Sequence, residues 1–513
     1  MGEKYLNLSQ IREQVEELEG TKFPVKSYSK IELEPAYNEA KKNLLDYMML
    51  VNKAHLIMLK EQEIIKKEDA KSIMKGILEV DKDKFRNSQY TGEFEDLYFE
   101  VESNIIKNSG DIGGNLHIAR SRNDMAVALY RLVIRDRLLS LYKSACEVQK
   151  VIIEFSEEHK ETIMIAHTHT QQAQPTYLGH YTMGIQWVIN RDIVRFKSAF
   201  NTCNRSALGA AAITTSGFNV NRDRMSELLA FNDVIENSYD CIGGGDYLGE
   251  VATSIQLAAI NLGRFVSDLL LWATQEFNIL KVSRGYVQIS SIMPQKRNPV
   301  SIEHMRALLS AVIGNCSTIL TMLHNTPYGD IVDTEDDAQP YIWKAIDTMK
   351  DIYDLLYSIM ATLEINKEVL KDRVEKSFAV VTELADTLVR EYKIPFRLAH
   401  SIVSASVDKC MKEGLLPKDI DRKMLENLYE EKCGEKIEFH EEIIKRALDP
   451  YNFVNIRSVE GGPAPKSMKD MIFKGRNKNA SNINWYSEKF ASIANSINNI
   501  ESLSKEMVRE YEK

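Results

Sequence analysis

The sequence predicts an all-α protein built around a bundle of long helices. Only 12 prolines and 24 glycines interrupt its 513 residues, and the stretches between them carry apolar residues at helical rather than alternating spacing. Two apolar stripes are the strongest evidence, because each repeats every three or four residues and so marks one face of a long helix. The stripes consist of Leu248, Val251, Ile255, Ala258, Leu262, Phe265, Leu269 and Trp272, and of Ile342, Ile346, Met349, Tyr353, Leu356, Met360 and Leu363.

The length of these two helices favours a bundle. Each covers about 25 residues, or roughly 37 Å at about 1.5 Å per residue, which suits a bundle better than a compact orthogonal fold. Periodicity does not distinguish burial of the stripes within one chain from burial between chains. Long helices with extended seams often associate as symmetric oligomers.

The chain divides into three expected regions. An N-terminal region covers residues 1–115, the long-helix bundle covers 116–366, and a helical C-terminal region covers 367–513. An extra tail starts at about Lys466. It contains the polar run Asn477–Asn482 and then a final expected helix, and we expect it to be an appendage.

Composition and charge exclude several classes of function. The formal net charge of -9 and the absence of basic clusters that alternate with aromatic residues argue against a nucleic-acid partner. The six cysteines are scattered without a CxxC pair, which argues against a zinc site or a redox motif and favours a reducing cytoplasm. The N-terminus lacks a basic, apolar leader. The apolar window Leu269–Ala273 is too short and too closely flanked by charges to span a membrane, so we expect a soluble protein.

The segment Ser290–Pro299 carries the most chemical information. It combines two serines, a lysine, an amide and two prolines without helical periodicity, so we expect an ordered loop. Asn298 and Pro299 suit an N-cap and a first helical position. Backbone donors and Lys296 would then meet near a helix N-terminus, a combination that favours a bound carboxylate. The alternative is a polar interhelical loop with a cap and no ligand.

Three segments, in order, resemble those of a known enzyme family. Ser290–Pro299 resembles the signature of the fumarase/aspartase superfamily, and Gln295 before Lys296 is the form seen in argininosuccinate lyases. The similarity extends from about Ala54 to Pro465 and leaves out the tail. The other two matching segments are Gly114–Asp124, which contains Ser-Arg-Asn-Asp, and Thr168–Pro175, which begins Thr-His-Thr-Gln.

The resemblance implies a fold, an assembly and a reaction. The fold would be the L-aspartase-like one, with a three-domain subunit. Four identical subunits would form a twenty-helix core, and each active site would gather the three segments from three different chains. The enzyme would break a carbon–nitrogen bond of a small N-succinyl substrate by β-elimination and release fumarate, without a metal or an organic cofactor. In this family the substrate is argininosuccinate and the other product is arginine, a step of arginine biosynthesis.

The resemblance also assigns roles to individual residues. Ser290 would be the base that takes the proton from the succinyl carbon, helped by the Lys296 cation or by backbone donors. His169 would assist protonation of the departing nitrogen, with Glu303 as its carboxylate partner. Further substrate contacts would come from Ser121, Arg122, Asn123, Thr168, Gln171, Ser291, Asn298 and Tyr328.

Simpler interpretations of these residues compete with the catalytic one. A lone histidine such as His169 is more often structural, and Arg122 and Asp124 suit interhelical ion pairs. An acid such as Glu303 is favourable near a helix N-terminus by about 0.3–1 kcal/mol without any catalytic duty. Its position seven residues after Lys296, as in the family, favours the catalytic interpretation.

Several positions depart from the family pattern, mostly where the amine half of the substrate should lie. Ile289 and Met125 replace a glycine and a glutamine, and Ile242–Asp246 lacks an expected arginine. In Tyr328–Asp337 a one-residue shift puts Thr334 at a glutamine and Asp337 at a carboxylate-binding lysine. This reversal of charge would repel a substrate carboxylate. Two alternatives therefore stay open: a paralogue that cleaves a different N-succinyl amine, and a catalytically idle structural homologue. Retention of Ser290, Lys296, His169 and Glu303 argues against the second, and adenylosuccinate lyase matches less well.

Overall fold

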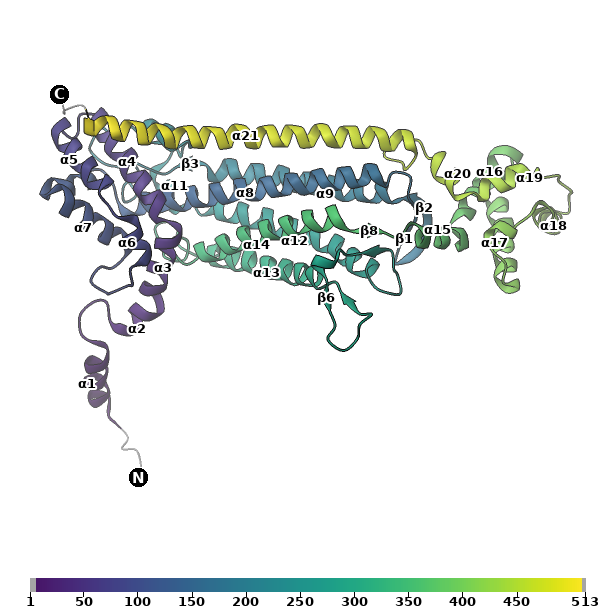
Figure 1. Cartoon of the computed structure of the whole chain (residues 1–513), viewed down its shortest axis with the longest axis horizontal. Coiled ribbons are helices and arrows are strands. Elements are labelled where there is room, and N and C mark those ends of the chain that lie inside the picture. The colour runs from purple at the N-terminus through teal and green to yellow at the C-terminus, as the bar shows by residue number, and fades with distance from the viewer. Residues whose placement is uncertain (1–5, 510–513) are drawn as a thin grey trace.

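The computed structural model describes residues 6–509 and confirms the all-α prediction. Five long helices lie side by side and form a bundle (Figure 1). α8 is continuous over 37 residues. The five helices are α8 (Arg122–Glu158), α9 (Leu178–Cys203), α12 (Asp246–Trp272), α13 (Val300–Leu323) and α14 (Gln339–Thr362).

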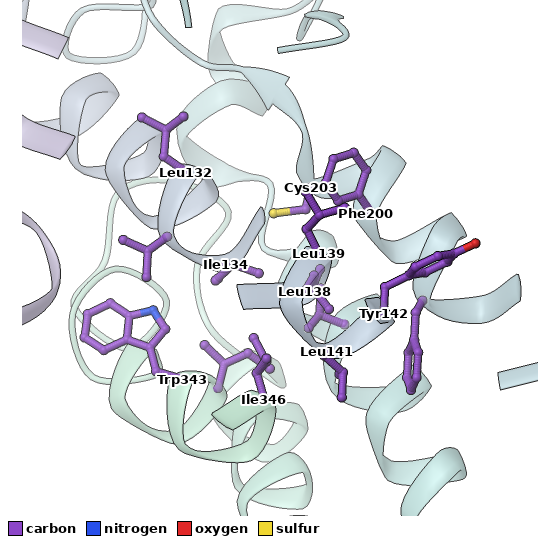
Figure 2. Packing of buried hydrophobic residues seen from close by; sticks show 14 of the residues in the cluster. Leu132, Ile134, Leu138, Leu139, Leu141, Tyr142, Phe200, Cys203, Trp343 and Ile346 are labelled. Atoms are coloured by element: carbon purple, nitrogen blue, oxygen red, sulfur yellow. The ribbon is translucent and has the colours of Figure 1, made fainter. Parts of the chain in front are cut away.

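The two predicted apolar stripes form the faces of α12 and α14 that point into the core. Every residue of the first stripe is buried, and so is every residue of the second except the half-buried Leu363. Figure 2 shows part of this core, to which α8 contributes Leu138 and Leu141, α9 contributes Phe200 and α14 contributes Ile346. The helical spacing therefore located the interior of the bundle correctly.

Helices α12 and α13 are long and apolar enough to cross a membrane by length and composition. Both are members of the bundle, because α12 packs on α9 and α13, and α13 packs on α12 and α14. α13 is less buried than α12. Its apolar window has a mean hydropathy of 1.4, but only 22% of this window is buried within the chain.

The N-terminal region is helical, and its core is continuous with that of the bundle. Its first three elements, α1, α2 and η1, contain no buried residue. The region contains α1 (Leu8–Glu19), α2 (Lys26–Tyr28), the π-helical turn η1 (Ser29–Leu33), α3 (Glu34–Asn43), α4 (Leu45–Glu61), α5 (Lys67–Leu78), α6 (Lys82–Asn87), α7 (Leu97–Ser109) and the 3-10 helix η2 (Asp111–His117).

The C-terminal region has a separate apolar core, which also takes in Ile163, Ile165 and Tyr177 from a hairpin at the end of the bundle. The boundaries at residues 115 and 366 stay predictions. The helices of this region are α15 (Lys367–Lys376), η4 (Phe378–Val380), α16 (Val381–Tyr392), α17 (Phe396–Glu413), η5 (Pro417–Asp419), α18 (Arg422–Cys433), α19 (Glu441–Leu448) and α20 (Pro450–Asn455).

Short strand pairs and short helices connect the long helices, and helical periodicity gave no signal for the strands. The strand pairs are antiparallel except β3–β4, which is parallel. They are β1 (Ile163–Thr168) with β2 (Gln171–Tyr177), β3 (Arg205–Ser206) with β4 (Asp233–Val234), β5 (Leu280–Lys281) with β8 (Glu364–Ile365), and β6 (Gln288–Ile289) with β7 (Arg297–Asn298); the short helices are α10 (Arg222–Leu228), α11 (Ser238–Gly243) and η3 (Arg284–Tyr286).

The tail expected as an appendage is instead part of the body of the molecule. It forms one helix of 45 residues, α21 (Pro465–Arg509), which runs back along α8 and α9 and reaches α4 and α5 (Figure 1). The Asn-rich run is polar because it binds polar groups of the bundle: the Asn479 side chain donates to the Cys146 carbonyl at 2.8 Å and to Gln149 Oε1 at 3.0 Å. Trp485 packs on Tyr142, with ring centroids 4.6 Å apart.

Asn479→Ala should therefore destabilise the protein, because the Cys146 carbonyl loses this side-chain donor and Gln149 Oε1 keeps only the longer hydrogen bond from Asn482, at 3.2 Å. We expect a loss of about 1–3 kcal/mol in the free energy of unfolding, measured by chemical denaturation. Asn477→Ala is the matched control, since Asn477 is exposed on the same helix. Equal effects of the two substitutions would contradict this role of Asn479.

Candidate active site

The segment Ser290–Pro299 forms the loop and the second strand of a β-hairpin, whose first strand is β6. The loop projects from the side of the bundle (Figure 1). β6 and β7 pair Gln288 with Asn298 and Ile289 with Arg297. The predicted cap is wrong by one residue: Asn298 lies in β7, Pro299 is the N-cap, and α13 begins at Val300. Asn298 is held by strand pairing, and this leaves the cap position to Pro299.

The Ser290 hydroxyl lies among backbone donors of its own loop. Its oxygen accepts a hydrogen bond from the Met293 amide at 3.1 Å and a weaker one from the Ile292 amide at 3.4 Å. The Lys296 amide closes the turn by donating to the Met293 carbonyl at 3.0 Å. Amide donors that point at an oxygen stabilise negative charge on it, so this loop supplies donors of the kind that an ionised hydroxyl would need.

Lys296 and Glu303 line one hollow beside this loop. The hollow has a volume of about 740 Å³ and lies between the loop, the first turn of α13 and the end of α12. Both side chains are exposed, as is Ser291. The hairpin also exposes apolar side chains, with Ile289 of β6 at 74% and Ile292 of the loop at 83% accessibility. A loop that presents both apolar and reactive groups to solvent suits contact with another molecule.

His169 lies at the tip of a second hairpin, formed by β1 and β2. Thr168 pairs with Gln171, so His169 and Thr170 form a two-residue turn, and both have positive φ values of 50° and 63°. This is the type I′ geometry, which residues other than glycine, asparagine and aspartate adopt at a cost. The strained turn holds the exposed His169 away from the body of its own chain.

Ser121, Arg122 and Asn123 lie at the N-terminus of α8. Ser121 is the N-cap and forms a capping box with Asp124. Asp124 also accepts hydrogen bonds from the amides of Gly209 at 2.9 Å and Ala211 at 3.1 Å, which fixes the neighbouring loop. Burial raises the pKa of Asp124 to about 6, against the effect of these two amide donors and of the Ser121 amide, which donates to it at 3.0 Å. The sequence left an interhelical ion pair open as a role for Asp124. In the structure Asp124 instead completes the capping box of α8.

Arg122 forms the ion pairs that the simpler interpretation anticipated. Its guanidinium donates to Asp96 at 2.8 Å and to Glu95 at 3.3 Å, and it lies over the Phe99 ring at 4.6 Å. Asp96 also caps α7 by accepting from the Phe99 amide at 2.9 Å. Sequence reasoning missed these two carboxylates, although Asp96 directly before a helix was a recognisable N-cap.

Tyr328 and Asp330 lie at the same end of the bundle as Asn123. Asn123 Nδ2 donates to Asp330 Oδ2 at 3.0 Å. The Tyr328 ring stacks on Tyr239 with centroids 5.7 Å apart, and its hydroxyl donates to Asp240 at 2.8 Å. The sequence marked Tyr328 as a candidate but gave no sign that Asp330 would contact Asn123, because 207 residues separate the two.

Within one chain the candidate residues stand at opposite ends of the bundle. Asn123 begins α8 and the hairpin of His169 follows the end of α8, so about 55 Å of helix separates them at 1.5 Å per residue. The loop of Ser290 adjoins the end of α12 that lies beside the His169 hairpin. Between residues 6 and 509 no hydrogen bond or ion pair joins Ser290, His169 and Asn123 directly.

Two protein-family models match this chain. A model described as lyase matches residues 23–314, and one described as argininosuccinate lyase C-terminal matches residues 378–455. Argininosuccinate lyase of Methanocaldococcus jannaschii is 38% identical over 84% of this chain and 88% of its own length. Argininosuccinate lyase 2 of Agrobacterium fabrum is 38% identical over 89% and 91%.

Solved structures share the fold. An EDDS lyase variant with bound fumarate superposes with a TM-score of 0.85 at 28% identity, covering 93% of this chain and 96% of its own. A class II fumarase from Schistosoma mansoni gives a TM-score of 0.64 at 15% identity, covering 82% and 91%, and so supports the fold alone. These likenesses confirm the predicted L-aspartase-like fold.

The carboxylates near Arg122 make stability depend on pH. Burial, followed by repulsion from Asp336 and Asp330, raises the pKa of Glu335 from 4.5 to about 8. Between these values the unfolded chain has lost the Glu335 proton and the folded chain has kept it, so this group's contribution to stability falls as pH rises from about 4.5 to about 8.

Glu335→Gln removes this titration. The melting temperature of the variant relative to the unsubstituted protein should therefore rise between about pH 5 and about pH 8. Differential scanning calorimetry at several pH values tests this, with Asp333→Asn on the same loop as the control. A difference in melting temperature that does not change with pH would show that Glu335 ionises normally.

Proposed function

Because this chain belongs to the argininosuccinate lyase family, we propose that it cleaves argininosuccinate into arginine and fumarate by β-elimination. It is a carbon–nitrogen lyase of the fumarase/aspartase superfamily. The observation that carries the proposal is the loop in which Ser290 accepts two amide hydrogen bonds near Lys296. This is the chemistry that removal of a proton beside a carboxylate requires.

Ser290 is the proposed base. A free hydroxyl is too weak an acid to ionise near neutral pH, so the two amide donors and the Lys296 cation must stabilise the alkoxide. When the alkoxide takes the proton, the substrate carboxylate gains a second negative charge. Lys296, Asn298 and the N-terminus of α13 stabilise that charge, with Ser291 beside them.

His169 is the proposed partner on the leaving side. As the carbon–nitrogen bond breaks, the departing nitrogen needs a proton, and an imidazole supplies one near neutral pH. Glu303 of another chain would orient the ring and stabilise its cation. Thr168 and Gln171 flank the same turn and would contact the substrate from this side.

The proposed assembly is a homotetramer whose active sites each draw on three chains. Because Asn123 and His169 lie at opposite ends of α8, an antiparallel neighbour is needed to place one beside the other. The outer face of α13 supports this: it carries the small residues Ala307, Ala311 and Gly314, all exposed, which allow helices to approach closely. We place the enzyme in the cytoplasm, consistent with six cysteines that are all free.

A second candidate is cleavage of a different N-succinyl amine. Asp330 supports this candidate, because its carboxylate accepts a hydrogen bond from the side-chain amide of Asn123, which is a proposed substrate contact. No comparable observation supports a catalytically idle homologue, because two backbone amides of the loop still donate hydrogen bonds to the Ser290 hydroxyl.

Ser290→Ala should lower kcat by about 10²–10⁴-fold, the usual contribution of a positioned base. Production of fumarate from argininosuccinate, followed by absorbance, measures this. Size-exclusion chromatography should show the oligomer unchanged. Ser404→Ala, at an exposed serine of α17 in the C-terminal region, is the control. Full activity of the Ser290 variant would place the base elsewhere.

Mixing two inactive variants tests the shared site. Ser290→Ala and His169→Asn, unfolded and refolded together, should regain a measurable fraction of activity, because some sites then take an intact serine and an intact histidine from different chains. Ser290→Ala mixed with Lys296→Met is the control and should stay inactive, since both residues lie on one loop. Failure of the first mixture would indicate that Ser290 and His169 come from the same chain.

A further inference from the structure

The hydrogen bonds of Asn123 leave no free donor on its side chain. Its two amide hydrogens go to Asp330 Oδ2 at 3.0 Å and to the Ala212 carbonyl at 3.2 Å, and its oxygen accepts from the Ser121 hydroxyl at 3.1 Å. A substrate carboxylate that approaches Asn123 must therefore compete with the carboxylate of Asp330. A cationic group meets no such competition.

Asp330 carries its negative charge next to a second carboxyl group that holds a proton. Glu335 lies beside it, and its raised pKa makes it the protonated member at neutral pH. A protonated carboxyl donates a hydrogen bond, and this hydrogen bond from Glu335 lowers the pKa of Asp330 against the larger effect of burial. The charge on this loop is thus concentrated on Asp330, which faces Asn123.

Arg122 lowers the pKa of Asp330 and so stabilises its charge, but the same guanidinium is shared with two other carboxylates. Arg122 already forms ion pairs with Asp96 at 2.8 Å and with Glu95 at 3.3 Å. The remaining groups at this end also suit a cation: the stacked rings of Tyr239 and Tyr328 are 46% and 59% exposed, and the Tyr328 hydroxyl is bonded to Asp240. Aromatic faces beside carboxylates attract positive charge.

We propose that Asp330 is a specificity-determining residue, which selects a cationic amine half of the substrate and disfavours a carboxylate on it. The inference rests on the fumarate-releasing part of the proposed function and favours the second candidate, a different N-succinyl amine, because the arginine half of argininosuccinate carries a carboxylate. The favoured substrates are N-succinyl compounds whose amine half carries a guanidinium or ammonium group and no acid group near Asp330. Opposite charge at this position attracts and like charge repels, which is how charge discriminates between two ligands.

Arginine and agmatine form the matched pair that tests this, because agmatine is arginine without its carboxylate. In the reverse reaction each adds to fumarate, and loss of fumarate absorbance gives kcat/KM for both. For the unsubstituted protein we expect agmatine to be used at least as well as arginine. In Asp330→Asn the ratio of agmatine to arginine should fall about tenfold. In Asp330→Lys it should fall further, in favour of arginine.

Asp333→Asn is the control, because it removes one negative charge from the same loop at a half-buried position. It should leave the ratio unchanged, and size-exclusion chromatography should give the same oligomer for all variants. An unchanged ratio in both Asp330 variants, with argininosuccinate still cleaved, overturns this inference and leaves the proposed function standing. If neither amine consumes fumarate and argininosuccinate is not cleaved, the proposed function fails and the inference falls with it.

Discussion

The length of one helix constrains everything else in this molecule. α8 runs unbroken for 37 residues, with Ser121–Asn123 at its start and the hairpin of His169 beyond its end. Each residue of an α-helix adds about 1.5 Å along its axis, so the number of residues in α8 fixes the distance between its ends. The matched segments that contain Asn123 and His169 are therefore fixed at opposite ends of one chain. In the proposed tetramer a site that uses both is built from several chains, and the exposed face of α13 and the exposed Ile292 of the Ser290 loop are the surfaces that we propose for contact between chains.

Local geometry at each end prepares the residues for that assembly. The Ser290 loop turns backbone amides toward the hydroxyl, and the type I′ turn holds His169 outward at a cost in backbone strain. At the far end, Asp124 caps α8 and fixes the neighbouring loop, while Asp330 binds Asn123. In the proposed mechanism the first pair of features serves proton transfer, and the second sets the charge that the substrate meets.

Helical periodicity predicted the bundle because burial of α12 and α14 is encoded in the apolar residues themselves, from Leu248 to Trp272 and from Ile342 to Met360. The pattern of apolar residues did not predict the short hairpins, since a seven-residue strand such as Gln171–Tyr177 is too short and too polar to show alternating apolar and polar residues. The tail was misjudged because Asn479 looks solvent-facing until its partner Gln149 is known. Contacts between residues far apart in sequence, such as Asn123 with Asp330, left no local signal, and resemblance alone linked the three matched segments.

A structure of the oligomer with fumarate bound, determined by crystallography or electron cryomicroscopy, would test directly whether three chains share one active site. Ser290 of one chain, His169 of a second and Asn123 of a third should surround the same fumarate, with the serine oxygen about 3–3.5 Å from a fumarate carbon. Fumarate held by residues of a single chain, or with Ser290 and His169 on different ligands, would contradict this arrangement.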